Sequence, residues 1–293
     1  MLDYSLVAAV AAVVREGSFE RAALALHITA SAVSQRVKLL EQRLGQVLVV
    51  RGQPCTATAA GLALCRHAEQ VAMLEAELAE LKDESAAPVT LRVAVNADSL
   101  ATWFITAAAA FAQQPGALLD LRLEDQDHTA EQLRRGEVIA AVTGLATPVQ
   151  GCRSAALGRM RYLATASPAF VRRHFAPGVN AETLAAAPSL TFNQKDRLQE
   201  QWIEAVCGAK LSPPRHWLPA SQAFIDAAIA GLGWGMNPAA LVAEALQNGR
   251  LVELLPGQPL WVPLHWQHPR HAPPMLQGLT LAVLAAARAN LES

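Results

Sequence analysis

Residues 18–44, SFERAALALHITASAVSQRVKLLEQRL, restrict the possible folds of this chain more than any other segment. Apolar residues recur at helical spacing after Ser18, a residue type that favours the N-cap position, so a helix is expected to begin there. Residues 27–29 interrupt the pattern, and either Thr29 or Ser31 is suited to cap a second helix. The segment therefore predicts two helices joined by a tight turn.

The second predicted helix has two unlike faces. Val33, Val37, Leu40 and Leu44 form an apolar stripe, whereas the opposite face carries hydroxyl, amide and cationic side chains. Such side chains reach base edges and phosphates in a DNA groove without adding bulk. An ordinary helical hairpin with a solvated polar face is the alternative. We assign DNA contacts to Ser31, Ser34, Gln35, Arg36, Lys38 and, in the following segment, Arg51.

The composition describes a globular protein. At 293 residues the chain is long enough for about two domains, and 52% hydrophobic with 17% charged residues exclude a disordered chain. No apolar run approaches the roughly 18 residues that span a membrane, and the N-terminus lacks the pattern of a secretion signal. Net charge is −1, but residues 1–58 hold six basic against four acidic side chains, a small local excess.

The four cysteines are widely spaced, without a CxxC pair or a metal-binding spacing. We therefore expect reduced thiols in a cytoplasmic protein, with no metal and no cofactor.

The segments after the helix pair predict a small wing and a long helix. Residues 47–51 have strand character, residues 53–54 suit a turn, and Thr56 and Thr58 suit a second short strand. Over residues 59–84 apolar residues recur in heptads, which predicts a helix that pairs with a partner helix. Packing of this helix on its own domain is the alternative. The predicted seam is Leu64, Val71 and Leu78 with His67, Leu74 and Leu81.

Beyond Pro88 strands alternate with helices in two successive units, which predicts an α/β domain with a doubly wound parallel sheet. The expected strands are about 91–96, 118–124, 138–144, 188–192, 251–255 and 263–267, and the expected helices include 100–113, 129–135 and 274–291. The expected limits are 1–58 for the helix-turn-helix, 59–87 for the linker helix, and 88–293 for the α/β domain, with lobe I at 88–161 and 266–293 and lobe II at 162–265.

The helix pair and wing, AALALHITASAVSQRVKLLEQRLG and LVVRGQPCTATAAG, resemble the winged helix-turn-helix of LysR-type transcriptional regulators. The resemblance implies a dimerising linker helix and a two-lobed, periplasmic-binding-protein-like effector domain that closes over a ligand. Segments such as VNADSLATWF (95–104), TFNQKD (191–196) and GLGWGMNP (231–238) are similar to the ArgP/LysG subfamily, regulators of lysine and arginine export. Where the family's wing often has a basic residue, this chain has Thr56.

A ligand site is expected where the strand 91–96 ends. Ligands of open α/β sheets bind at the carboxyl ends of strands, and a helix N-terminus favours an anion. Ser99 therefore suits a carboxylate and Asp98 an ammonium group, although helix capping is the simpler role for both. The subfamily resemblance adds Thr102 and Trp103 as walls of the pocket.

Acidic residues follow the second strand of this domain. Asp125 and Asp127 suit a cationic group, although an acidic loop is usually only solvated. One site for a carboxylate and another for an ammonium or guanidinium group together describe a basic amino acid. The cleft is expected to be completed by Thr143 at the third strand end and by Phe192, Asn193 and Asp196 from lobe II. The glycine-rich segment 231–238 is expected to form a tight turn, with Trp234 packed beside the cleft.

Two classes of function are compatible with an α/β chain of this kind. The first is a transcription regulator, a homodimer or a dimer of dimers, whose effector is lysine or arginine and whose targets include genes such as a basic amino acid exporter. A different small metabolite is the alternative effector. Its partners would be double-stranded DNA, the effector, a second copy of the chain, and RNA polymerase. The second class is an enzyme, which we do not expect because GxSxG, P-loop and HExxH motifs are missing.

Overall fold

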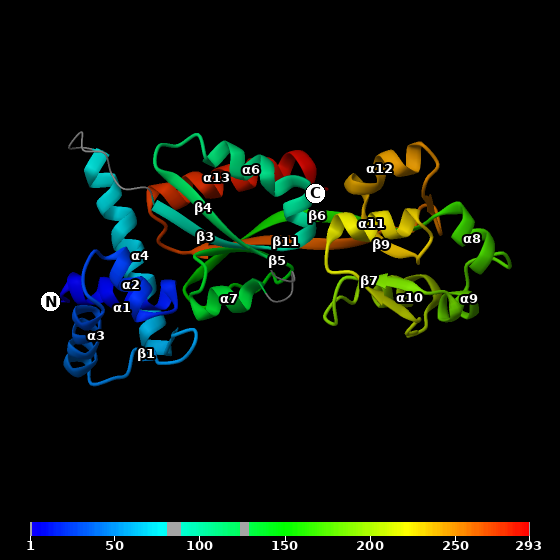
Figure 1. Ribbon diagram of the computed structural model, residues 1–293. Coiled ribbons are helices and arrows are strands. Elements are labelled where there is room, and N and C mark those ends of the chain that lie inside the picture. Colours follow the sequence, from blue (N-terminus) through cyan, green and yellow to red (C-terminus); the bar gives the residue numbers. More distant parts are fainter. Residues whose placement is uncertain (1, 81–88, 124–128, 293) are drawn as a thin grey trace.

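The chain forms three parts in a row in the computed structural model, which describes residues 2–80, 89–123 and 129–292. Figure 1 shows the N-terminal helices at one end, a first α/β lobe in the middle and a second α/β lobe at the other end. Among the described residues, no helix is both long and apolar enough to cross a membrane.

The N-terminal head is built from three helices whose starts are capped by side chains. They are α1 (Tyr4–Glu16), α2 (Phe19–Ala25) and α3 (Ala30–Leu44). Ser18 caps α2 by accepting a hydrogen bond from the Arg21 amide, and Thr29 caps α3 by accepting one from the Ala32 amide. Thr29, and not Ser31, is therefore the cap of the second helix. Val33, Val37 and Leu40 are buried in the core of the head, as their spacing predicts, whereas Leu44, in the last turn of α3, is exposed.

The wing is tied to α3 by one carboxylate. Its strands are β1 (Val49–Val50) and β2 (Thr56–Ala57), which pair antiparallel. Glu41 of α3 accepts hydrogen bonds from the backbone amides of Leu48 (2.8 Å) and Val49 (3.2 Å). Thr58, which we predicted in the second strand, instead accepts a hydrogen bond from the Gly61 amide at the start of the next helix. A threonine there satisfies a helix-terminal amide, so it contributes more as a cap than in a strand.

The linker helix α4 (Ala59–Glu80) leads from the wing to the α/β domain. Leu64 packs on the core of the head, and the His67 imidazole lies 3.0 Å from the Tyr4 hydroxyl, so the first heptad contacts its own head. Leu74 is exposed, as a partner-facing position should be. The side chains of Leu78 and Leu81 lie outside the described part of the chain.

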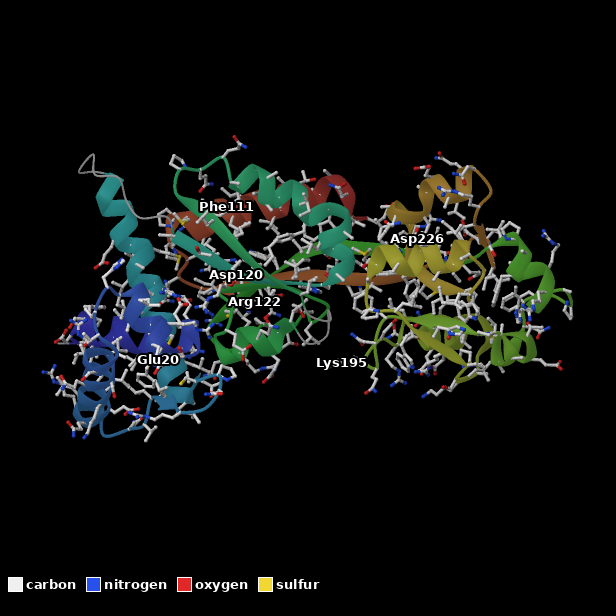
Figure 2. All side chains as sticks on the ribbon, in the orientation of Figure 1. Glu20, Phe111, Asp120, Arg122, Lys195 and Asp226 are labelled. Atoms are coloured by element: carbon white, nitrogen blue, oxygen red, sulfur yellow. The ribbon has the colours of Figure 1, made fainter. Side chains whose placement is uncertain are left out.

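Lobe I is a layer of helices on each face of a sheet. Its elements are β3 (Val89–Val95), the helical run α5 (Ala97–Ser99), η1 (Leu100–Phe104) and α6 (Ile105–Phe111), β4 (Ala117–Leu123), α7 (Thr129–Arg135), β5 (Ala140–Thr143) and α13 (Pro274–Asn290). Helices α6 and α13 lie side by side over one face, and α7 lies on the other (Figure 1). Side chains fill the layer between α6 and the sheet, and Phe111 there is fully buried (Figure 2).

Two long strands cross between the lobes. They are β6 (Cys152–Ala166) and β11 (Leu260–Pro269), which pair with each other antiparallel. The sheet order is β10-β6-β11-β5-β3-β4, where β10 is Val252–Glu253, and β9 (Gly235–Pro238) also pairs with β6. The predicted parallel pairing is therefore right for β3–β4, for β3–β5 and for β7 (Ser189–Thr191) with β8 (Arg215–Trp217). It is wrong for the pairs that β6 and β11 make. Because the chain crosses outward in β6 and returns in β11, the two strands run in opposite directions.

Lobe II surrounds the far ends of the crossing strands. Its elements are α8 (Pro168–His174), α9 (Ala181–Ala186), β7 (Ser189–Thr191), α10 (Leu198–Cys207), β8 (Arg215–Trp217), α11 (Ser221–Ile229), β9 (Gly235–Pro238), α12 (Ala239–Gln247) and β10 (Val252–Glu253). The lobe limits expected from the sequence, 161/162 and 265/266, both fall inside crossing strands.

Candidate functional site

The polar face of α3 points away from the core of the head. Ser31, Gln35 and Lys38 are exposed, and Ser34 and Arg36 are half-buried. Within the described residues none of these five side chains makes a hydrogen bond or ion pair. All five therefore keep their donors and acceptors for another molecule.

Arg51 lies in the wing, directly after strand β1. Its guanidinium group is 5.1 Å from the centre of the Phe19 ring, in a cation–π contact, and the side chain is exposed. The aromatic ring restrains the stem of Arg51 while its charge stays accessible. Such a placement suits a contact to a phosphate.

A small pocket lies between the lobes. Three of the predicted residues, Asp98, Phe192 and Asp196, line it. Asp98 comes from the helix start after β3, and the other two come from the segment after β7, so the pocket joins strand ends of both lobes. Sequence reasoning missed the other lining residues, which are Ser221, Phe224, Met236, Asn237 and Pro238.

The Asp98 carboxylate links the two lobes. One oxygen accepts a hydrogen bond from the Tyr162 hydroxyl at 2.8 Å, and the other accepts one from the Ser221 hydroxyl at 3.0 Å. Tyr162 is on the crossing strand β6 and Ser221 begins α11 in lobe II. The two donors stabilise the charged form of Asp98 and hold it at the centre of the cleft.

Three other residues predicted from lobe I, Ser99, Thr102 and Trp103, are not among the described residues that line this pocket. Ser99 is fully buried, and its hydroxyl has no hydrogen-bond partner within the described residues. The Thr102 hydroxyl donates to the Asp98 carbonyl oxygen at 2.6 Å, inside the helix. Trp103 packs in the hydrophobic core, with its ring 5.6 Å from that of Phe104, and so supports the lobe where we had expected it to line the pocket.

Thr143 is also fully buried, at the end of β5. It is paired across the sheet with His265 of β11, and burial lowers the pKa of the His265 imidazole.

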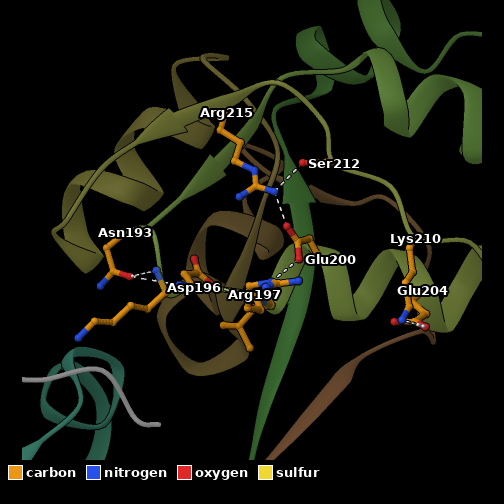
Figure 3. Close-up of polar contacts among 10 residues, drawn as sticks. Asn193, Asp196, Arg197, Glu200, Glu204, Lys210, Ser212 and Arg215 are labelled. Atoms are coloured by element: carbon orange, nitrogen blue, oxygen red, sulfur yellow. Dashed lines mark hydrogen bonds and ion pairs between the residues drawn. The ribbon is translucent and has the colours of Figure 1, made fainter. Parts of the chain in front are cut away.

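Asn193 and Asp196 form a hydrogen-bonded turn at the mouth of lobe II (Figure 3). The Asn193 side-chain oxygen accepts from the amides of Lys195 (2.8 Å) and Asp196 (3.1 Å). The Asp196 carboxylate accepts from the amides of Phe192 (2.9 Å) and Leu198 (3.0 Å). Asp196 therefore fixes the loop that carries Phe192 and also presents its charge to the pocket. Asp125 and Asp127 lie outside the described residues.

The glycine-rich segment 231–238 supplies the missed wall of the pocket. A Cβ atom on Gly235 would lie 2.4 Å from the Phe224 ring, so a glycine there lets Phe224 reach the pocket. Met236, Asn237 and Pro238 follow directly and line it. We had assigned this segment only a tight turn with Trp234 beside the cleft, but Trp234 is fully buried, with its ring 5.5 Å from that of Trp202.

Two family models match the chain. Residues 5–62 match "Bacterial regulatory helix-turn-helix protein, lysR family", and residues 87–288 match "LysR substrate binding domain". The regulator ArgP of Pseudomonas aeruginosa is 46% identical over 290 residues, covering 98% of this chain and 96% of the relative.

Solved structures agree with this assignment over the whole chain. The crystal structure of ArgP from Mycobacterium tuberculosis matches with a TM-score of 0.87 and 46% identity, covering 100% of both chains. The full-length LysG of Corynebacterium glutamicum, solved with bound effector Arg, matches with a TM-score of 0.78 and 40% identity, also over 100% of both chains. With an exposed polar helix in its head and a pocket between two lobes, the chain belongs to the LysR family of DNA-binding transcriptional regulators with an effector-binding domain.

Proposed function

We propose that the effector of this regulator is a basic amino acid, lysine or arginine, bound in the pocket between the lobes. The observation that carries the proposal is the Asp98 carboxylate, which lines that pocket and accepts hydrogen bonds from the hydroxyls of Tyr162 and Ser221. A carboxylate held in this way attracts an ammonium or guanidinium group. The arginine-bound LysG of Corynebacterium glutamicum, with 40% identity, supports the same class of ligand.

The α-carboxylate of the ligand would bind at the start of the helical run 97–111. The hydroxyl of Ser99 has no partner there within the described residues, and the helix amides add positive potential. Phe192 and Asp196 would form the wall from lobe II, with Asp196 as a second negative charge. Thr102, Trp103, Thr143 and Asn193 would support these contacts from behind, and Asp125 and Asp127 stay predictions for the ligand cation.

We further propose that α3 reads the operator through Ser31, Ser34 and Gln35, while Arg36, Lys38 and Arg51 contact phosphates. Two copies would pair through α4, as a homodimer or a dimer of dimers, so that two heads bind neighbouring half-sites. We assign DNA binding to residues 1–58, dimerisation to residues 59–87 and effector binding to residues 88–293. The regulated genes would include a basic amino acid exporter, with RNA polymerase as a partner at the promoter. We propose no enzymatic activity, and a cytoplasmic location.

Calorimetric titration of the purified protein with lysine, arginine and norleucine tests the effector proposal. Norleucine keeps the α-ammonium and α-carboxylate groups but lacks the side-chain cation. Saturable binding of lysine or arginine with no binding of norleucine is the expected result. If neither basic amino acid binds, the effector proposal is wrong and a different small metabolite becomes the candidate. Binding of the protein to DNA from its own upstream region separates a regulator of either kind from an enzyme.

A further inference from the structure

The linker helix α4 is attached to lobe I of its own chain as well as to the head. Cys65 is buried in the core of the head, whereas Met73 of the same helix is buried in the core of lobe I, with 1% of its surface exposed. Glu69 lies midway between them. Because 65, 69 and 73 are four residues apart, they lie along one side of the helix. That side therefore joins the two domains, and Figure 1 shows α4 between them.

An ion pair holds this side of the helix to the sheet. The Glu69 carboxylate pairs with the guanidinium group of Arg92, which is on β3, and both side chains are more than half-buried, with 31% and 22% exposed. Burial lowers the pKa of Arg92, since removal from water penalises the charged form. Loss of either partner would leave the other as a poorly solvated charge, so the contact depends on both residues.

A second contact lies three residues earlier in the helix, at Arg66. The Arg66 guanidinium donates a hydrogen bond to the Arg134 carbonyl oxygen at 3.3 Å, at the end of α7. Its stem lies against Gly136, where a Cβ atom would be only 2.6 Å from the Arg66 Cδ. Gly136 also has a φ of +68°, a conformation that suits glycine. Because Gly136 has no side chain, Arg66 can pack against lobe I, one helical turn from the Glu69–Arg92 pair.

The attachment to lobe I does not use the predicted dimer seam, although the first seam residues, Leu64 and His67, contact the head. At 100° per residue, Leu64, Val71 and Leu74 lie on the side of α4 opposite to Cys65, Glu69 and Met73. Leu74 is accordingly 50% exposed. One side of α4 can therefore pack on lobe I of its own chain while the other side packs on a second copy of the chain.

Strand β3 connects this attachment to the effector pocket. Arg92 is three residues before the end of β3, and Asp98 follows the same strand at the pocket. The strand is paired on both sides, with β4 and β5, so it moves as part of the sheet. A rotation of lobe I on ligand binding would thus carry Arg92, and with it Glu69 and α4.

We propose that Arg66 and Glu69 of α4, with Arg92 and Gly136 of lobe I, form a clasp that fixes the DNA-binding head on lobe I and relays the state of the effector pocket to the head. The clasp follows from contacts within the chain, whereas the relay rests on the proposed effector function.

Hydrogen exchange of the full-length protein tests the clasp without any effector. In Arg92→Gln and in Glu69→Gln, the amides of residues 65–73 should exchange about tenfold or more faster than in the wild type, because the helix opens locally from lobe I. The exchanged pair Glu69→Arg with Arg92→Glu should restore most of the protection. Arg215→Gln is the matched control, because Arg215 and Glu200 form a comparably buried pair in lobe II (Figure 3), at the opposite end of the molecule from α4 (Figure 1). Wild-type exchange of α4 in both single variants would overturn the proposal.

DNA titration of the same variants tests the relay. Each single variant should bind lysine or arginine with wild-type affinity, yet the amino acid should change its DNA affinity by a smaller factor than in the wild type. The exchanged pair should recover the response, and an undiminished response in both single variants would refute the relay. Should the wild type bind neither amino acid, the effector proposal fails separately, and the exchange result still decides whether the clasp exists.

Discussion

The recognition face of α3 and the pocket between the lobes use polar side chains in opposite ways. On α3, Ser31, Gln35 and Lys38 are exposed and, within the described residues, make no hydrogen bond. In the pocket, Asp98 and Asp196 already accept hydrogen bonds from the protein. The polar groups of α3 are therefore available to another molecule, whereas the two carboxylates of the pocket are held in fixed positions by the protein itself.

The largest effect is expected for a substitution on α3. Gln35→Ala removes a proposed base contact from both heads of a dimer at once. Each good base contact contributes about 1–3 kcal/mol, so two should lower specific affinity by about 30-fold or more. Titration of operator and unrelated DNA measures the effect, and unchanged amino acid binding serves as the folding control. A wild-type footprint from both this variant and Ser34→Ala would show that α3 does not read the operator.

In the pocket, Asp98→Asn should have the next largest effect. The substitution keeps the size of the side chain but removes the charge that would meet an ammonium group. Since a hydrogen bond to a charged group contributes about 1.5–3 kcal/mol, affinity for lysine or arginine should fall about 10- to 100-fold. Ser221→Ala is the matched control, because it removes one donor to Asp98 and leaves the carboxylate. A wild-type binding isotherm for Asp98→Asn would exclude this carboxylate from the ligand site.

Lys38→Gln distinguishes phosphate contacts from base contacts on the same helix. Loss of one phosphate contact per head should reduce the slope of log affinity against log salt by roughly 0.9 per lysine, or about 2 for a dimer. Specificity between operator and unrelated DNA should change little. An unaltered salt slope would mean that Lys38 does not contact the DNA backbone.

Asp196→Asn should have the smallest effect and separates the two roles of that residue. Because Asp196 holds the amides of Phe192 and Leu198, its substitution should cost about 1 kcal/mol of unfolding free energy. Effector affinity should fall by less than in Asp98→Asn. Thermal unfolding and calorimetry on the same sample measure both quantities, and an affinity loss equal to that of Asp98→Asn would place Asp196 in direct contact with the ligand.

The same contrast explains what the sequence could predict. The helices of the head, the caps at Ser18 and Thr29 and the outward face of α3 follow from periodicity and local chemistry, which are properties of short segments. The pocket is assembled from strand ends far apart in the chain. Asp98 and Ser221 are 123 positions apart, and no local pattern indicates that their side chains meet.

Two further features depended on tertiary structure. The antiparallel pairing of β6 with β11 arises because the chain crosses between the lobes twice, and alternation of strands with helices does not reveal the direction of a crossing. Trp103 was expected to line the pocket but is buried in the core, because large aromatic side chains contribute most when removed from water. The closely spaced glycines of residues 231–238 could have indicated the pocket wall that sequence reasoning missed. Glycines permit close packing of another residue on the backbone, as Phe224 packs on Gly235.

One titration tests the central claim, that a pocket selective for a basic amino acid controls the DNA-binding face of α3. Affinity for a DNA fragment containing the operator would be measured with no amino acid and with saturating lysine, arginine or norleucine. Lysine or arginine should change the binding curve or the footprint of the wild type, norleucine should not, and Asp98→Asn should respond to none of them at the same concentrations. Identical curves under all four conditions for a protein that binds the fragment would contradict the claim.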